Sequence, residues 1–215
     1  AALQHKWSFW ARSNQLAPQG DWTYWLLLAG RGFGKTRTGA EWVRAQAKEN
    51  GDLRIALVAA TLAEARSVMV EGVSGLLNLE FDSKDSPAFE PSLRRLIWPS
   101  GAIATLYSAA EPDSLRGPEH HIAWADEVAK WSDGVAAWDN LALTLRLGHT
   151  PRLVATTTPR AVPLVRRILA MPGLVTTRGR MGDNRLNLPR SYVSSMRDIY
   201  GGTRTGRQEL DGELL

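Results

Sequence analysis

A glycine-rich segment directly after a short apolar run constrains this chain more than any other feature. The segment reads Ala29-Gly30-Arg31-Gly32-Phe33-Gly34-Lys35-Thr36. It fits the phosphate-binding pattern G-x-x-x-x-G-K-[ST] except at the first position, where alanine replaces glycine. Glycines let backbone amides approach phosphate oxygens closely, and the start of a following helix adds a positive dipole end. The segment therefore predicts a strand, a loop and a helix in that order, with a nucleotide bound at the loop.

The polar residues of this loop have separate expected roles. Lys35 is expected to neutralise the β- and γ-phosphates, and the hydroxyl of Thr36 to bind Mg²⁺. The general pattern does not require Arg31, which is either a second cation near the phosphates or a solvated charge. The residues expected to bind nucleotide here are Gly30, Arg31, Gly32, Phe33, Gly34, Lys35 and Thr36.

Strand-like and helix-like segments alternate along the chain. Expected strands cover 24–29, 54–60, 122–125 and 153–157, with a hairpin over 93–98 and 102–108. Expected helices cover 6–14, 36–49, 62–77, 138–147, 163–170 and 191–200. Such alternation is typical of a parallel sheet covered by helices on both faces. The composition shifts to Gly, Arg and Asn past Pro172, so we expect a core over 1–172 and a small appended subdomain over 173–215.

Composition excludes several classes of protein. The absence of cysteine excludes disulfide scaffolds, cysteine-ligated zinc, iron–sulfur clusters and thiol nucleophiles. The first residues show no export signal and no apolar run near them is long enough to span a membrane, so we expect an intracellular, soluble protein. The net charge of +4 is uneven, because residues 140–182 hold seven Arg and no Asp or Glu. Arginine suits phosphate contacts, but this bias alone leaves nucleic-acid binding open.

Two adjacent acids end an apolar run about 90 residues after Lys35. The run is Ile122-Ala123-Trp124-Ala125, followed by Asp126 and Glu127. We expect Asp126 to hold Mg²⁺, directly or through water, and Glu127 to orient and activate an attacking water. A hydrolase needs this second acid, whereas a kinase does not.

Two further segments carry candidate residues. Thr156, Thr157 and Thr158 end an apolar strand, where hydroxyls can sense a γ-phosphate, although threonine is also common in strands. Arg116 precedes Gly117 in a loop, and it is either an arginine finger supplied to a neighbouring subunit or a surface charge. The spacing does not decide between these two readings of Arg116.

Taken together, these motifs resemble the ATPase domain of the large terminase subunit, the DNA-packaging motor of tailed phages and gene transfer agents. The resemblance spans nearly the whole chain. It rests on the segments at Trp22–Thr36, Ser114–Gly117, Trp124–Glu127, Leu145–Arg152, Thr156–Arg160 and Gly206–Leu214.

The resemblance implies a role for each matching residue. It makes Lys35 and Arg31 the cations of a deviant Walker A motif, Glu127 the catalytic carboxylate, and Thr156–Thr158 the coupling motif. It places Arg116 at the position of a finger that acts in trans. It also implies a glutamine that contacts adenine, for which Gln15 is the better candidate and Gln19 the other.

The resemblance also implies an architecture and partners. The fold expected is an α/β P-loop NTPase of the additional-strand catalytic-Glu type, with residues 173–215 as a lid or linker. ATP and Mg²⁺ are the expected substrate and cofactor. The expected partners are double-stranded DNA, a portal protein, a small terminase subunit and further copies in a ring, all in the host cytoplasm. The family's nuclease domain has no counterpart in these residues, so no DNA cleavage is expected.

The DNA contacts are the least constrained part of this prediction. Phosphate binding needs only accessible cations, and the candidates are Arg94, Arg95, Arg166 and Arg167. Two other functions stay open at this stage. One is a different P-loop motor such as a helicase, and the other is an assembly module that binds nucleotide without hydrolysing it.

Overall fold

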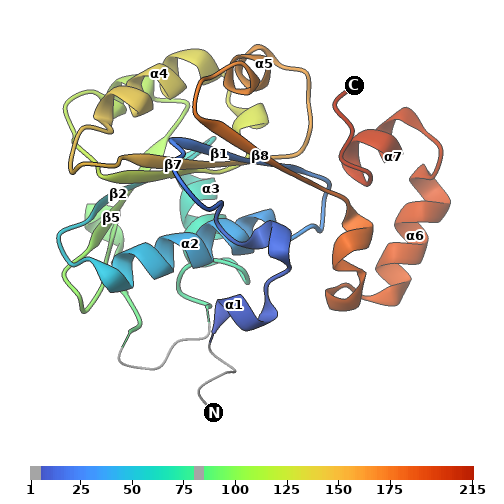
Figure 1. The fold of residues 1–215 in the computed structure, drawn as a ribbon, viewed down its shortest axis with the longest axis horizontal. Coiled ribbons are helices and arrows are strands. Elements are labelled where there is room, and N and C mark those ends of the chain that lie inside the picture. The colour runs from blue at the N-terminus through green and yellow to red at the C-terminus, as the bar shows by residue number, and fades with distance from the viewer. Residues whose placement is uncertain (1–5, 80–84) are drawn as a thin grey trace.

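One eight-stranded sheet organises the molecule. The computed structural model describes residues 6–79 and 85–215, and its strand order is β3-β4-β5-β2-β6-β7-β1-β8. The pairs β3–β4 and β4–β5 are antiparallel, and all other neighbours are parallel. Figure 1 shows α4 and α5 on one side of the sheet, α2 on the other, and α6 and α7 beyond the end of β8. The expected α/β class with a mostly parallel sheet is confirmed.

The elements have the following bounds. The strands are β1 Tyr24–Ala29, β2 Arg54–Ala59, β3 Ala88–Glu90, β4 Arg95–Ile97, β5 Ile103–Ser108, β6 Ile122–Ala125, β7 Arg152–Thr157 and β8 Leu174–Gly179. The α-helices are α1 Trp7–Trp10, α2 Lys35–Glu49, α3 Leu62–Glu64, α4 Gly134–Thr144, α5 Pro163–Leu169, α6 Arg190–Tyr200 and α7 Arg204–Glu209. The other helical turns are η1 Ser13–Gln15, η2 Ala65–Val70, η3 Pro91–Leu93, η4 Pro112–Leu115, η5 Val128–Lys130 and η6 Met181–Asn187.

The central strands are buried on both faces, which explains their unbroken apolar sequences. In β1, Leu27 faces one hydrophobic cluster together with residues of α2, and Leu26 and Leu28 face a second cluster together with residues of α4 and α5. Burial of both faces is what a parallel sheet between two helical layers requires. None of the described helices has both the length and the apolar character needed to cross a membrane.

The strand order places the sequence motifs together at the carboxyl ends of neighbouring parallel strands. β7 lies between β6 and β1, and all three run parallel. The glycine-rich loop follows β1, the two acids follow β6, and Thr156 and Thr157 end β7 with Thr158 directly after it. Because the carboxyl ends of parallel strands share an edge, segments that are far apart in sequence meet there.

Several expected elements differ from those observed. The helix expected over 62–77 ends near Val70 as a π-helix, and Gly72 and Gly75 follow it, where a Cβ would lie 2.6 Å from the carbonyl oxygens of Val68 and Val70 respectively. The helix expected over 138–147 begins four residues earlier, and the one expected over 6–14 divides into α1 and η1. Strand β3 was not expected, and residues 80–84 of the acidic stretch lie outside the described part.

The sheet also extends further along the chain than expected. β8 pairs with β1 over six residues, from Tyr24–Leu174 to Ala29–Gly179. The expected boundary at 172/173 falls just before this strand, and the helical end of the chain begins only at η6. The sequence does not predict β8, because the side chains of this strand are mostly only partly buried and it has no apolar run.

Candidate functional site

The loop between β1 and α2 has the backbone geometry that its glycines permit. Gly32 and Gly34 have φ values of +76° and +99°, in the left-handed region that favours glycine. Gly34 precedes Lys35, the first residue of a 15-residue helix. The first amides of such a helix have no intrahelical acceptor and carry the positive end of the dipole. Ala29 is the last residue of β1 and has no positive φ, so this position does not need glycine.

Lys35 and Glu127 lie next to each other at the carboxyl ends of the central strands. The Lys35 ammonium lies 3.5 Å from Glu127 Oε1 and donates to the Ala29 carbonyl at 2.9 Å. It also donates to Thr158 Oγ1 at 3.3 Å. The Thr158 amide donates to Glu127 Oε2 at 3.3 Å. One residue from each of the three motifs therefore contacts the other two.

Asp126 and Glu127 are adjacent in sequence but lie in different surroundings. Asp126 is buried and accepts a hydrogen bond of 2.5 Å from the Thr156 hydroxyl, which itself accepts from the Glu127 amide at 3.2 Å. Burial, and then the charge of Glu127, raises the pKa of Asp126 to about 6. Thr157 accepts from the Ala129 amide at 3.1 Å. The end of β7 is thus bonded to the segment that carries both acids.

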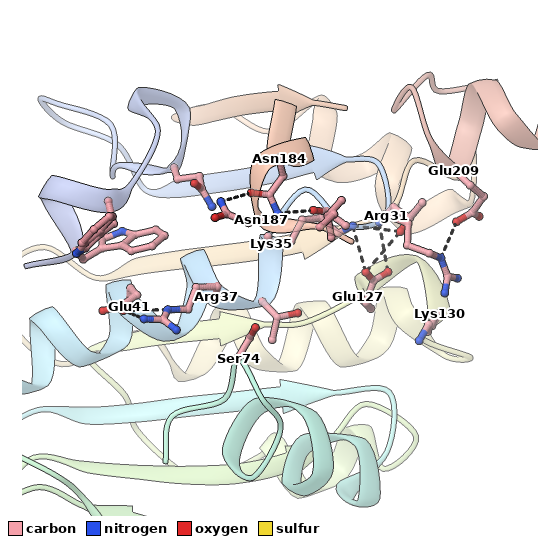
Figure 2. Close-up of a pocket in the computed structure, with 18 of the residues that line it drawn as sticks. Arg31, Lys35, Arg37, Glu41, Ser74, Glu127, Lys130, Asn184, Asn187 and Glu209 are labelled. Atoms are coloured by element: carbon pink, nitrogen blue, oxygen red, sulfur yellow. Dashed lines mark hydrogen bonds and ion pairs between the residues drawn. The ribbon is translucent and has the colours of Figure 1, made fainter. Parts of the chain in front are cut away.

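A large pocket of about 1060 Å³ opens over this edge. In Figure 2, Lys35 and Glu127 face one another in the pocket, and Glu209 approaches the same region from α7. Of the expected site residues, those lining the pocket are Gln15, Arg31, Gly32, Gly34, Lys35, Thr36, Glu127 and Thr158. Gln15 is buried and donates to Thr38 Oγ1 at 3.1 Å, whereas Gln19 is exposed and does not line the pocket.

Phe33 anchors the glycine-rich loop by packing its side chain against β8. Its ring is fully buried, and a Cβ on Gly179 of β8 would lie 2.1 Å from it. The Arg12 guanidinium lies 4.7 Å from the ring centroid and donates to the Phe33 carbonyl at 2.5 Å. It also donates to Asn184, whose amide donates to the Gly32 carbonyl at 2.7 Å. Residues before β1 and after β8 therefore both contact the loop.

Sequence reasoning missed several residues of the pocket. They are Trp7, Trp10, Arg37, Glu41, Ser74, Lys130, Arg160, Asn184, Asn187, Leu188 and Glu209. Arg160 and Glu209 lie in segments that carry the resemblance, which implies no separate role for either residue. The segment around Glu209 contacts the glycine-rich loop through backbone atoms. Such contacts cannot be predicted from the types of side chain in the sequence.

Arg116 lies outside the lining of this pocket. Its side chain is 72% exposed and pairs with Asp113 at 3.1 Å. The four arginines considered for DNA contacts lie in two places: Arg94 directly precedes β4 and Arg95 is its first residue, whereas Arg166 and Arg167 are on α5. Two of them are paired with carboxylates, Arg95 with Glu90 and Arg167 with Asp139, each at 2.5 Å.

Comparison with protein-family models identifies one family for this chain. The sequence profile described as terminase large subunit, T4likevirus-type, N-terminal, matches residues 26–172. No curated protein sequence matches the chain. The ATPase domain of the Thermus phage P74-26 large terminase is similar in structure, with a TM-score of 0.72, 16% identity, and coverage of 98% of this chain and 99% of that one.

Two further large terminase structures are also similar. The large terminase of a thermophilic bacteriophage, solved with ADP, has a TM-score of 0.74 at 14% identity, and that of bacteriophage HK97 has 0.67 at 16%. Each match covers 91% of this chain but only 48% and 47% of the other. The first of these proteins was also solved with ATP-γ-S. At such identities the similarity shows a shared fold.

Proposed function

The chain belongs to the family of N-terminal domains of T4-like large terminase subunits, and from this membership we propose that it hydrolyses ATP to translocate double-stranded DNA into a viral prohead or phage-like capsid. The observation that carries this proposal is the contact between Lys35 and Glu127, 3.5 Å apart over the carboxyl ends of β1 and β6. A phosphate-binding cation and a carboxylate beside it are the two groups that hydrolysis of a bound nucleotide needs.

The roles proposed for the site residues follow from their positions. The first amides of α2 and the Lys35 ammonium hold the β- and γ-phosphates. Glu127 orients a water and accepts its proton as the water attacks the γ-phosphorus, with ADP as the leaving group. Thr158 contacts both residues, so the threonine strand end senses the difference between ATP and ADP. Gln15 is the proposed adenine contact.

The residues at this edge also fit a Mg²⁺ ion. Among residues 6–79 and 85–215, no three His, Cys, Asp or Glu side chains form a complete metal site. A complete set is not needed, because Mg²⁺ beside a nucleotide keeps several waters and takes only one or two protein oxygens. The Thr36 hydroxyl, which lines the pocket, is one proposed ligand, and the buried Asp126 carboxylate would hold the ion directly or through water. Bound Mg²⁺ would offset the negative charge of the phosphates.

The remaining parts of the proposal concern partners. We propose that the chain forms a homo-oligomeric ring in the host cytoplasm, together with a portal protein and a small terminase subunit. In this ring, Arg116 reaches the nucleotide of a neighbouring subunit. The 72% exposure of Arg116 and its place outside its own pocket support a role in trans.

Replacement of Lys35 tests the proposed nucleotide site. Lys35→Ala removes the ammonium that faces the phosphates, so we expect ATP affinity and ATP hydrolysis to fall by about 100-fold or more. Lys48→Ala is the matched control, because Lys48 is an exposed lysine at the far end of the same helix, paired with Asp85. Hydrolysis by Lys35→Ala at the rate of Lys48→Ala, with both variants folded by circular dichroism, would contradict the proposal.

A further inference from the structure

Glu209 links two arginines that line the pocket. This glutamate is the last residue of α7, and its carboxylate lies 3.8 Å from Arg31 Nε and 3.6 Å from Arg160 Nη2. Arg31 belongs to the glycine-rich loop, and Arg160 follows the three threonines. Figure 2 shows Glu209 entering this region from the C-terminal helices, on the same side as Arg31. A carboxylate of the lid thus bridges two cations that flank the site proposed for phosphate.

The backbone at Glu209 is docked directly on the glycine-rich loop. The Arg31 amide donates to the Glu209 carbonyl at 2.6 Å, and the Met181 amide donates to the Leu210 carbonyl at 2.8 Å. A Cβ on Gly30 would lie 2.6 Å from the Leu210 carbonyl oxygen, and a Cβ on Gly212 would lie 2.4 Å from that of Gly179. The glycine-rich loop and the end of α7 are thus in direct backbone contact, with no room for a side chain between them. A shift of one therefore requires a shift of the other.

The Glu209 carboxylate is poorly satisfied where it lies. Its Oε2 atom is buried and has no hydrogen-bond partner within the described residues, and its Oε1 atom accepts one long hydrogen bond, of 3.4 Å, from the Gln208 side chain. Both arginine contacts exceed hydrogen-bond length, although the Glu209 side chain is only 17% exposed. A phosphate offers a guanidinium short, charge-assisted hydrogen bonds, which are stronger than these contacts. The arginines therefore gain by exchanging Glu209 for a phosphate oxygen.

We propose that Glu209 is a positioning residue that competes with the nucleotide's phosphates for Arg31 and Arg160, so that phosphate binding releases the end of α7. This inference rests on the proposed function, because it places a polyphosphate at the glycine-rich loop. Linkage requires the reverse effect as well, so Glu209 weakens phosphate binding to the same extent that phosphate weakens the contact of α7.

The variant Glu209→Gln tests this competition. It keeps the size of the side chain and removes its charge. We expect inorganic tripolyphosphate and ATP to bind about fivefold more tightly than to the native chain, the size typical of partly exposed ion pairs. The matched control is Glu213→Gln, which removes a 48% exposed carboxylate, paired with Arg207, from the same segment. Equal or weaker binding by Glu209→Gln, measured by titration calorimetry, overturns the proposal.

A double-mutant cycle locates the effect. In an Arg160→Gln background, Glu209→Gln should tighten tripolyphosphate binding by less than in the native background, because one of the two competing contacts is already gone. An equal gain in both backgrounds overturns the assignment of Arg160.

Amide hydrogen exchange tests the release of α7 in the native chain, so this measurement needs no variant. In the native chain, tripolyphosphate should speed exchange at Leu210 and its neighbours, and slower or unchanged exchange overturns the release of α7. The two proposals fail differently. A native chain that binds neither ATP nor tripolyphosphate contradicts the proposed function, whereas normal binding that is indifferent to Glu209 contradicts only the competition.

Discussion

Glu127 has a backbone conformation that is unusual for a residue with a side chain. Its φ is +47°, and among the described residues only Arg94 shares a positive φ without being glycine. Such a conformation costs about 1 kcal/mol or more, and it persists only where surrounding contacts impose it. Here the Thr156 hydroxyl holds the Glu127 amide, and the Thr158 amide holds its carboxylate. The strand end thereby turns Glu127 toward Lys35 while Asp126 stays buried.

The sequence predicted this acid pair but not the difference between its members. An apolar run ending in two acids indicates a strand end that bears carboxylates. It cannot say which of them is buried, because that depends on Thr156, which is 30 residues away in sequence. The contrast between a buried Asp126 and a pocket-lining Glu127 is therefore a result of the fold.

His120 provides a pH-dependent term in stability that is separate from the site. It is buried between the Tyr107 hydroxyl, at 3.1 Å, and the Thr144 hydroxyl, at 2.9 Å. Burial, and then the charge of His121, lowers its pKa from 6.5 to about 4. Between these values His120 is neutral in the folded chain and protonated in the unfolded one. Stability therefore falls as the pH drops from 6.5 toward 4, by about 3 kcal/mol at most.

We expect His120→Gln to remove this pH dependence. Asp126 contributes with the opposite sign, because its raised pKa favours the folded state as the pH falls from 6 toward 3.8. The quantity to compare is therefore the difference in stability between the native chain and the variant, because the Asp126 contribution is the same in both proteins and cancels. Urea unfolding of both proteins at pH 7 and at pH 5 measures this difference. A stability difference between the two proteins that is the same at both pH values would contradict the prediction.

At the scale of elements, the contact between α2 and β6 depends on a glycine. A Cβ on Gly39 would lie 2.4 Å from the buried indole of Trp124, the residue two positions before Asp126. Glycine is a poor helix former, so its presence within α2 reflects this close approach. It lets the helix that begins with Lys35 lie directly on the strand that leads to the acids.

Gly39→Ala should destabilise the chain although alanine favours helices. Overpacking costs about 1–3 kcal/mol, and an overlap with three atoms of a buried ring lies toward the upper end of that range, above the gain of about 1 kcal/mol in helix propensity. Thermal unfolding measures the change. A smaller loss in a Trp124→Phe background would confirm the indole as the cause, and a raised melting temperature for Gly39→Ala alone would contradict the account.

The accuracy of the sequence prediction varied with the kind of element. Buried strands such as β1 and β6 were located closely, because burial on both faces leaves an unbroken apolar run. The helix over 62–77 was too long by several residues, since apolar periodicity does not reveal a π-helical turn. Strands β3 and β8 were missed because they lie at the two edges of the sheet and are only partly buried.

At the scale of the molecule, the arginine-rich stretch does not form one free basic surface. Four of its seven arginines have partners elsewhere in the fold. Arg146 pairs with Glu119, Arg160 with Glu209 and Arg167 with Asp139, while Arg152 lies 4.7 Å from the ring of Trp22. Much of this charge therefore serves internal contacts and the pocket. The proposed DNA contacts at Arg94, Arg95, Arg166 and Arg167 stay predictions.

Mixing two inactive variants tests whether Arg116 acts in trans. In a ring of Arg116→Ala and Glu127→Gln subunits, some sites combine the native Glu127 of one subunit with the native Arg116 of the next. We expect such mixtures to recover part of the ATP hydrolysis that each variant lacks alone. Absence of recovery at every mixing ratio, under conditions where the native chain forms rings, would contradict the proposed finger.

The most direct test of the central claim measures ATP affinity and ATP turnover on the same sample of Glu127→Gln. Lys35, the glycine-rich loop and Thr36 are untouched in this variant, so we expect ATP to bind at least as tightly as to the native chain. Removal of the general base should lower turnover by about 10²- to 10⁴-fold. The control is Glu119→Gln, an exposed glutamate paired with Arg146, which should retain both properties. Turnover by Glu127→Gln at the native rate would contradict the account.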